Sequence, residues 1–376
     1  MTAPQPMHTS QPLFQPWRLG ALDLQHRIVM APLTRMRASQ PGNVPHALNA
    51  LYYAQRATEG GLIVAEASQV VPEGQGVPAS PGIHSDAQQA GWKLVTDGVH
   101  ARGGRVFLQL WHVGRISHSS HQPDGAAPWA PSAIAAQGEA MTAGFERAPF
   151  PVPRALDLQA IERLKQAYVA AGHRAMAAGF DGVEVHSANG YLLEQFMLSR
   201  SNQRTDQYGG SLTNRIRLPI EVTECLVHAL GADRVGIRLS PFGVANDSGE
   251  DNPEPLFRTM IQALNRMQLA YLHLIEPRAS GAGQRDVDHP NMPCACATFR
   301  GDWDQALISA GNYNPQSAAD TVASGHADAI AFGRHFISNP DLPRRIQNGQ
   351  ALTPYQRATF YGGGSEGYTD YKAFGV

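Results

Sequence analysis

The chain has 376 residues, a formal net charge of −2, 43% apolar residues and 16% charged residues. This apolar content supports a packed core and excludes a chain that is disordered throughout. The near-neutral charge argues against a protein that binds nucleic-acid phosphates, and no apolar run has the length of a membrane span. The N-terminal residues lack the pattern of a secretory signal, and three cysteines are too few for a disulfide framework. We therefore expect a cytoplasmic protein with no nucleic-acid or membrane partner.

Eight short runs rich in Val, Ile, Leu and Ala recur along the chain. Nearly continuous apolar runs of this length are typical of parallel strands that are buried on both faces. The predicted strands are residues 27–31, 61–67, 105–111, 182–187, 234–240, 270–276, 306–311 and 328–333.

Helical periodicity fills the intervals between these runs. Residues 158–178 lie between Asp157, an expected N-cap, and Gly179. Residues 315–324 follow an Asn-Pro pair and end before a glycine. A second Asn-Pro pair, at 339–340, predicts a further helix start.

Segment 212–230 is a weaker helix because Pro219 would kink it or shift its start. Eight alternations of strand and helix favour an α/β fold of the (β/α)₈ TIM-barrel type over an open sheet.

Two long segments depart from this alternation. Residues 112–157 and 277–304 are rich in Pro, Gly and polar residues and show little periodicity. Structureless segments of this length are usually functional loops, so we expect both to lie over the C-terminal mouth of the barrel. With no internal repeat and no linker, residues 1–376 are predicted to form one domain.

Polar residues at the ends of the predicted strands mark the expected active site, because barrels of this kind carry it at the C-terminal ends. The set includes hydrogen-bond donors but no cluster of carboxylates. Its members are Thr34, Glu66, Gln109, Trp111, His186, Arg238, Glu276, Gly311, Gly333 and Arg334. His112, His118 and His121 lie in a polar loop, and we expect no metal site there.

The ends of the seventh and eighth strands predict a phosphate site. Gly311 and Gly333 would let backbone N–H groups approach an anion, and Arg334 follows directly. Each glycine alone is equally typical of a tight turn. No G-x-G-x-x-G follows the first strand, so a Rossmann dinucleotide site is not supported.

The hexapeptide from His186 to Tyr191 contains three side chains that can donate hydrogen bonds. His186 and Asn189 can direct two N–H groups at one oxygen, with the Tyr191 hydroxyl nearby. Such a group would stabilise negative charge on an oxygen while a proton is delivered. Taken alone, however, the hexapeptide is more typical of a capped turn around a buried tyrosine.

The same stretches carry a resemblance to a known family. Its first motifs are RIVMAPLTRMRA (27–38), LIVAEASQV (62–70), LQLWHVGRISH (108–118) and HSANGYLLEQFMLSRSNQRTDQYGGSLTNR (186–215). VGIRLSP (235–241), ISAGNY (308–313), DAIAFGRHFISNPDL (328–342) and TFYGGGSEGYTDY (359–371) continue it. In these motifs the chain resembles the Old Yellow Enzyme family of ene-reductases, and most closely the bacterial N-ethylmaleimide and nitrate-ester reductase branch.

The resemblance implies a (β/α)₈ barrel with non-covalent FMN at the C-terminal ends of the strands. NADPH or NADH would reduce the flavin, and an activated alkene such as an enone, a maleimide or a nitroalkene would then be reduced in the same pocket. Nitrate esters are further substrates in the family. Related proteins are monomers or homodimers.

The resemblance also implies residue roles. Contacts to FMN fall to Pro32, Leu33, Thr34, Ala65, Gln109, Arg238, Gly311, Asn312, Gly333 and Arg334. Substrate contacts fall to Thr34, Trp111, His186, Asn189, Arg278 and Tyr361, with His186 and Asn189 on the substrate oxygen and Tyr191 as proton donor. Much of the named bacterial branch has histidine where this chain has Asn189, which bears on substrate preference.

Two other functions stay open at this level. A barrel isomerase or aldolase would share the phosphate glycines but would need a catalytic lysine or carboxylate. The chain's three lysines, Lys93, Lys165 and Lys372, lie away from strand ends, whereas Glu66 and Glu276 end strands. A non-catalytic binding barrel is the third possibility.

Overall fold

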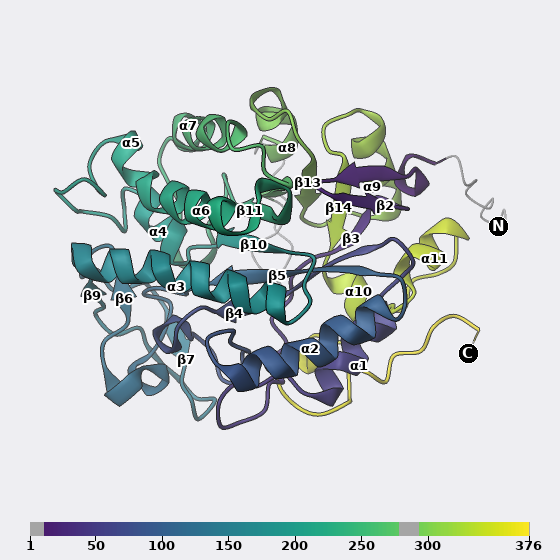
Figure 1. Ribbon diagram of the computed structural model, residues 1–376, viewed down its shortest axis with the longest axis horizontal. Helices are drawn as coiled ribbons and strands as arrows, with labels where there is room; N and C mark the ends of the chain where they lie inside the picture. The colour runs from purple at the N-terminus through teal and green to yellow at the C-terminus, as the bar shows by residue number, and fades with distance from the viewer. Residues whose placement is uncertain (1–10, 278–292, 376) are drawn as a thin grey trace.

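A computed structural model of the chain describes residues 11–277 and 293–375 (Figure 1). Eight parallel strands form a closed barrel, paired in chain order. They are β3 (Ile28–Met30), β4 (Leu62–Gln69), β5 (Arg105–Trp111), β10 (Gly182–Ser187), β11 (Val235–Leu239), β12 (Tyr271–Ile275), β13 (Leu307–Ala310) and β14 (Ala329–Phe332). All eight predicted strands, and with them the barrel, are confirmed.

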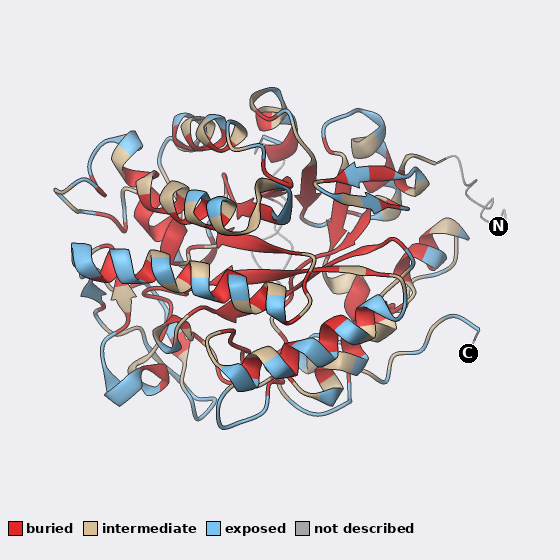
Figure 2. Ribbon diagram, in the orientation of Figure 1, coloured by how far each residue is buried: buried red, intermediate tan, exposed pale blue. Residues whose placement is uncertain are grey.

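Helices follow each strand and surround the barrel (Figure 1). They are α1 (Ala47–Arg56), α2 (Asp86–His100), α3 (Leu158–Ala177), α4 (Leu192–Met197), α5 (Leu212–Arg215), α6 (Arg217–Leu230), α7 (Pro253–Asn265), α8 (Ala295–Phe299), α9 (Pro315–Ala323), α10 (Arg334–Ser338) and α11 (Leu342–Gln347). Figure 2 shows the strands of the barrel almost entirely buried, whereas the long helices bury one face and expose the other. Among the described residues, no helix has the length and apolar character needed to cross a bilayer.

The predicted helix signals mostly hold. The Asp157 side chain accepts from the Ala160 N–H at the start of α3, and Asn314 forms a capping box before α9. Residues 212–230 divide at Ile216 into α5 and α6, so that Pro219 lies in the first turn of α6, where its missing N–H costs nothing.

The Asn339-Pro340 pair does not start a helix. Instead α11 begins at Leu342, after Asp341. The Asn339 side chain accepts from the backbone N–H of Thr353 at 2.7 Å, so it fixes the following segment and cannot cap α11.

The segment 112–157 contains four short strands that the sequence did not indicate. β6 (Trp129–Ala130) pairs with β9 (Arg154–Ala155), and β7 (Glu139–Met141) pairs with β8 (Arg147–Pro149). The β7–β8 hairpin lines the mouth of the barrel, as expected for this segment. Of the second predicted loop, residues 278–292 lie outside the described part.

An N-terminal hairpin closes the opposite end of the barrel. β1 (Trp17–Leu19) and β2 (Leu22–Leu24) pair antiparallel. Their buried Trp17, Leu19 and Leu24 pack against residues near the starts of the barrel strands, such as Val29 and Leu62. Any ligand of the barrel interior must therefore enter from the C-terminal mouth.

The C-terminal segment is fixed to the first and last βα units. Arg35 Nε donates to the Phe360 carbonyl at 2.9 Å, and Arg56 Nη2 donates to the Tyr368 carbonyl at 3.0 Å. The Tyr368 ring stacks on Tyr52, with centroids 4.1 Å apart.

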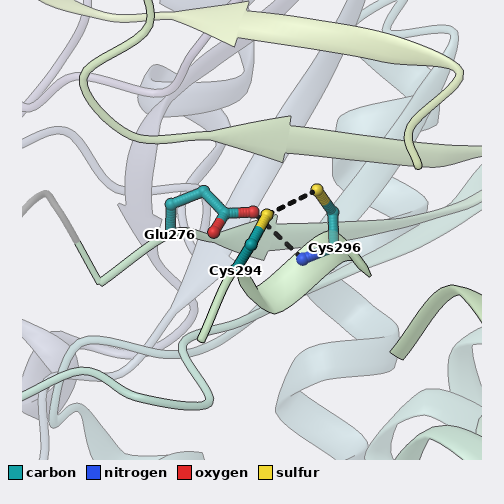
Figure 3. Close-up of side chains that lie close together, drawn as sticks. All are labelled: Glu276, Cys294 and Cys296. Carbon is teal, nitrogen blue, oxygen red and sulfur yellow. Dashed lines mark hydrogen bonds between the residues drawn. The ribbon is translucent and has the colours of Figure 1, made fainter. Parts of the chain in front are cut away.

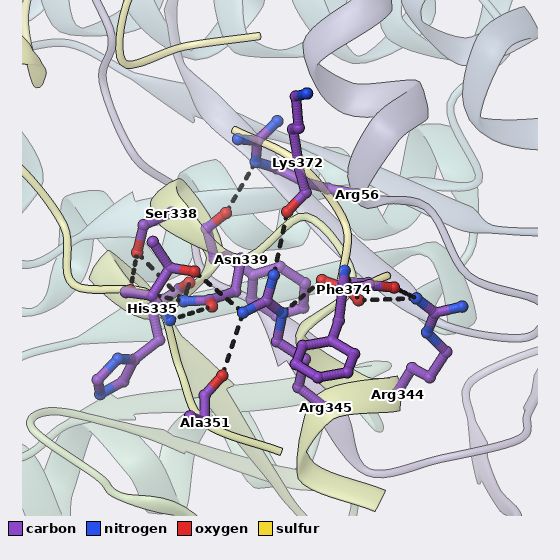
Figure 4. Close-up of polar contacts among 12 residues, drawn as sticks. Arg56, His335, Ser338, Asn339, Arg344, Arg345, Ala351, Lys372 and Phe374 are labelled. Carbon is purple, nitrogen blue, oxygen red and sulfur yellow. Dashed lines mark hydrogen bonds and ion pairs between the residues drawn. The ribbon is translucent and has the colours of Figure 1, made fainter. Parts of the chain in front are cut away.

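Further along this segment, Arg345 on α11 donates to the Ala351 and Lys372 carbonyls, and Arg344 donates to the Phe374 carbonyl (Figure 4). These bonds tie the chain between residues 351 and 374 to α11.

Candidate active site

A cavity of about 580 Å³ opens at the C-terminal ends of the barrel strands. Most of the site residues expected from the sequence line it. They are Pro32, Leu33, Thr34, Gln109, Trp111, His186, Asn189, Tyr191, Arg238, Gly311, Asn312, Gly333, Arg334 and Tyr361. The volume is in the range of small-molecule and cofactor sites.

Ala65 does not line the cavity. It is fully buried in the core cluster that also holds Ile63 and Leu108, whereas Ala67 lines the cavity. The register of β4 against β5 shifts between Ala65 and Ser68. This irregularity brings Ala67 to the cavity, so Ala67 replaces Ala65 in the candidate site. Arg278 lies outside the described residues.

Three aromatic side chains form one corner of the cavity. The Trp111 and His186 rings stack with centroids 6.2 Å apart. The Tyr191 ring meets both edge-on, at 4.9 Å from Trp111 and 5.1 Å from His186. Each ring limits the rotation of the other two, so this corner is rigid.

The turn after β10 holds Asn189 by its backbone. Asn189 has a φ of 56°, in the left-handed region that asparagine tolerates. Its N–H donates to Ser240 Oγ at 2.8 Å, and its carbonyl accepts from Asn246 Nδ2 at 2.8 Å. Since the backbone is fixed on both sides, the side chain of Asn189 is free to face the cavity.

Burial sets the protonation states of His186 and Tyr191. Burial and the nearby Arg238 lower the pKa of His186 to about 3, so its imidazole is neutral at pH 7. Burial and the neighbouring Tyr361 raise the pKa of Tyr191 to about 12, although a hydrogen bond with Asn246 acts in the opposite direction. Tyr191 is therefore a protonated phenol across the physiological range.

Three buried nitrogen atoms of cavity residues have no hydrogen-bond partner among the described residues. They are Trp111 Nε1, His186 Nδ1 and Arg238 Nε. An unpaired buried donor costs about 1–3 kcal/mol, so a ligand that supplies acceptor oxygens is favoured here. The carbonyl oxygens of a flavin ring and of a substrate fit this requirement.

A buried polar cluster lies beneath the cavity. Gln109 Nε2 donates to Glu184 Oε1 at 2.6 Å, and His273 Nδ1 lies 2.8 Å from Glu184 Oε2. Burial opposes the charge on Glu184, yet His273, Arg238 and Gln109 hold its pKa below the ordinary value. Glu184 therefore stays ionised and fixes the amide of Gln109 in one orientation.

The loops after β13 and β14 also line the cavity, where the sequence predicts a phosphate site. Gly311 has a φ of 130°, and a Cβ there would lie 2.9 Å from the Cβ of Glu276. A Cβ on Gly333 would lie 3.2 Å from Leu33 Cδ2, and Arg334 begins α10 directly after it. The positive φ and the close approach of Glu276 favour glycine at position 311, whereas at Gly333 the approach of Leu33 is less tight.

Tyr355 is a cavity residue that the sequence did not indicate. Arg334 Nη1 lies 3.4 Å from its hydroxyl, and the guanidinium lies 5.5 Å from the ring centroid. Asn246, Glu184 and His273 were also missed. For the last two, the available signal is a charged or polar residue inside an otherwise apolar strand.

The carboxylates required by an isomerase or aldolase point elsewhere. Neither Glu66 nor Glu276 lines the cavity. Glu66 accepts from the Arg35 N–H and the Tyr53 hydroxyl, and Glu276 accepts from the Ala295 and Cys296 N–H groups. No lysine lines the cavity formed by the described residues. This arrangement contradicts the isomerase or aldolase hypothesis.

The three loop histidines bind within their own segment. His112 Nδ1 accepts from the Gly114 N–H, His118 Nδ1 from the Ser120 N–H, and His121 Nε2 lies 2.7 Å from the Met141 carbonyl. They stabilise the loop over the mouth.

The comparisons with known proteins agree with this geometry. The profile of the NADH:flavin oxidoreductase / NADH oxidase family matches residues 12–353. A putative 12-oxophytodienoate reductase 11 from Oryza sativa subsp. japonica is 43% identical over 97% of this chain and 98% of its own length. The 12-oxophytodienoate reductase 2 of Arabidopsis thaliana is 43% identical over 96% of each chain.

Solved structures lead to the same family. A structure of morphinone reductase superimposes with a TM-score of 0.90 at 45% identity, covering 97% of this chain and 96% of that one. Morphinone reductase in complex with tetrahydroNAD gives a TM-score of 0.89 at 45% identity, covering 96% and 97%. The chain therefore belongs to the Old Yellow Enzyme family of oxidoreductases, with FMN as cofactor and a reduced nicotinamide nucleotide as reductant.

Proposed function

We propose that the protein reduces the C=C bond of alkenes conjugated to a carbonyl or nitro group, with His186, Asn189 and Tyr191 acting on the substrate. The observation that carries this proposal is the cavity corner where a neutral imidazole and an amide lie beside a protonated phenol. The names of the relatives, reductases of 12-oxophytodienoate and of morphinone, support the same substrate class.

Bound FMN supplies hydride chemistry in both half-reactions. We propose that Pro32, Leu33, Thr34, Ala67 and Gln109 line the flavin ring. Arg238 supplies positive charge near the ring. The guanidinium of Arg238 also interacts electrostatically with the Glu184 carboxylate. Gly311, Asn312, Gly333 and Arg334 hold the phosphate.

On the substrate side, His186 and Asn189 donate hydrogen bonds to the activating oxygen and polarise the alkene. Tyr191 then donates a proton to carbon. Trp111 and Tyr361 form walls of the substrate pocket. With Tyr361 in the C-terminal segment, substrate contacts come from both ends of the chain.

The proposal extends to the domain organisation, oligomeric state and location of the protein. We expect residues 1–376 to function as one FMN-binding domain, as a monomer or homodimer in the cytoplasm.

Anaerobic mixing experiments test the proposal. The purified yellow protein should be bleached by NADPH or NADH and should regain its flavin absorbance when 2-cyclohexenone is added. Bleaching without recovery, with an enone, a maleimide and a nitroalkene each in excess, would refute alkene reduction while leaving the family intact.

A further inference from the structure

A second cluster of reactive side chains lies outside the cavity, at the junction of β12 and α8. Glu276 follows the last residue of β12, while Cys294 and Cys296 lie at the start of α8. In Figure 3 the carboxylate and the two thiols point toward one another. Their ligand atoms all lie within 4.8 Å of one another.

The carboxylate of Glu276 is held in place by its neighbours. Its Oε2 accepts from the Ala295 N–H at 2.8 Å, and its Oε1 accepts from the Cys296 N–H at 3.0 Å and from Ser309 Oγ at 2.9 Å. With one such bond from the described residues, Oε2 keeps a lone pair that can face the thiols. Metal sites commonly have ligands oriented by outer hydrogen bonds in this manner.

The thiols are closely paired. Cys294 Sγ and Cys296 Sγ lie 3.4 Å apart. Cys296 is buried and Cys294 is exposed, which provides a path for an ion from solvent.

These dimensions suit a tetrahedral zinc-like ion. Bonds of about 2.3 Å to sulfur and about 2.1 Å to oxygen would place the ligand atoms about 3.6–3.8 Å apart. The observed separations require movements of about 1 Å or less. Two soft thiolates exclude Mg²⁺ and Ca²⁺, which prefer oxygen ligands only.

We propose that Glu276, Cys294 and Cys296 bind one thiophilic divalent cation of the Zn²⁺ type, with solvent as the remaining ligand. Binding forms two metal–sulfur bonds and one metal–oxygen bond, and the thiol protons pass to the buffer. None of the three residues lines the reaction cavity, so the ion would have a structural role. It would join the start of α8 to the end of β12 and, through Ser309, to β13. The proposal is independent of the proposed function.

The test uses the reduced holoenzyme, titrated anaerobically with Co²⁺ in the presence of a reductant that lacks thiols. Tetrahedral thiolate-bound Co²⁺ absorbs at wavelengths beyond the oxidised flavin bands, so the FMN does not mask the signal. We expect one equivalent to bind, Zn²⁺ to displace it, and protons to be released. Cys294→Ser and Cys296→Ser should each weaken binding by at least about 100-fold, since even outer-sphere partners contribute 10–100-fold.

Cys225→Ser is the matched control, because Cys225 is the remaining cysteine and lies on α6, outside the cluster. It should bind Co²⁺ as the parent does. Because Cys294 is exposed, its serine variant should fold, and retention of FMN shows that it has done so.

Four results would overturn the proposal. The first is no thiolate–Co²⁺ absorption at one equivalent. The second is the same signal in Cys294→Ser as in the parent, and the third is loss of the signal in Cys225→Ser. If instead the protein as isolated shows one titratable thiol, and three after reduction, with no metal bound in either state, the pair forms a disulfide and the metal assignment is wrong.

Discussion

Replacing Tyr191 by phenylalanine separates the two half-reactions. Phenylalanine keeps the edge-on contacts with Trp111 at 4.9 Å and His186 at 5.1 Å, so the cavity keeps its shape while the hydroxyl is lost. With a pKa of about 12, Tyr191 is protonated in all but about one molecule in 10⁵ at pH 7. Nearly every molecule therefore has the proton to donate. Removal of the hydroxyl should slow the proton-transfer step by the full contribution of a general acid, about 10²–10⁴-fold or about 3–5 kcal/mol in activation free energy.

Stopped-flow flavin absorbance measures each half-reaction by itself. Reduction by NADPH should be nearly unchanged in Tyr191→Phe, whereas reoxidation by 2-cyclohexenone should slow by about 10²–10⁴-fold. A nitroalkene should be less affected, because its nitronate product is stable enough to be protonated in water. In the parent enzyme the reoxidation rate should not titrate with Tyr191 until the pH rises toward 12.

Tyr168→Phe serves as the control, since the Tyr168 hydroxyl is buried on α3 away from the cavity. Equal slowing of both half-reactions in Tyr191→Phe would mean that the cavity is disturbed generally. An unchanged reoxidation rate with the enone would show that water or another residue supplies the proton.

Three further predictions concern other parts of the site. Replacing both His186 and Asn189 by alanine should weaken phenolic ligands and cripple alkene reduction while FMN stays bound; loss of flavin with unchanged ligand affinity would show that the pair is misplaced. Arg334→Ala should lower FMN affinity by about 10–100-fold, because a charge-assisted hydrogen bond contributes about 1.5–3 kcal/mol. The recovery of flavin fluorescence on release measures this affinity. Equal affinity in variant and parent would remove Arg334 from the phosphate site. Burial lowers the pKa of His112 to about 3, below its unfolded value of about 6.5, so the stability that it contributes is complete above pH 6.5 and is lost as the pH falls toward 3. Urea unfolding measures the free energy of unfolding at pH 7 and at pH 5. Its fall between these two pH values should be about 2 kcal/mol smaller in His112→Gln than in the parent. An equal fall in both proteins would contradict a buried neutral imidazole.

The barrel could be predicted from the sequence because each strand is buried on both faces and therefore consists largely of consecutive apolar residues. The same uniformity hides which face a residue occupies. In β4, burial is complete from Leu62 to Gln69, so the alternation that would assign Ala65 or Ala67 to the cavity cannot be read. The irregularity between Ala65 and Ser68 has no sequence signal of its own.

Short elements were missed for a different reason. The N-terminal hairpin has strands of three residues, and those of the mouth loop have two or three. Such strands carry no measurable periodicity and depend on tertiary packing. The start of α11 was misplaced because Asn339 binds a distant backbone group, which local capping rules do not anticipate.

The arginines that fix the C-terminal segment have a consequence for the order in which the enzyme is completed during synthesis. Arg35 follows the first barrel strand, and its partner Phe360 lies 325 residues later, beside the cavity residue Tyr361. The ribosome releases the segment around residues 360–368 only after every barrel strand has emerged. The barrel can close before this segment docks, so the nascent chain can carry the part of the cavity lined by Gly311 and Gly333 while the wall that Tyr361 contributes is still missing. The part of the cavity wall that Tyr361 contributes therefore forms after the barrel itself.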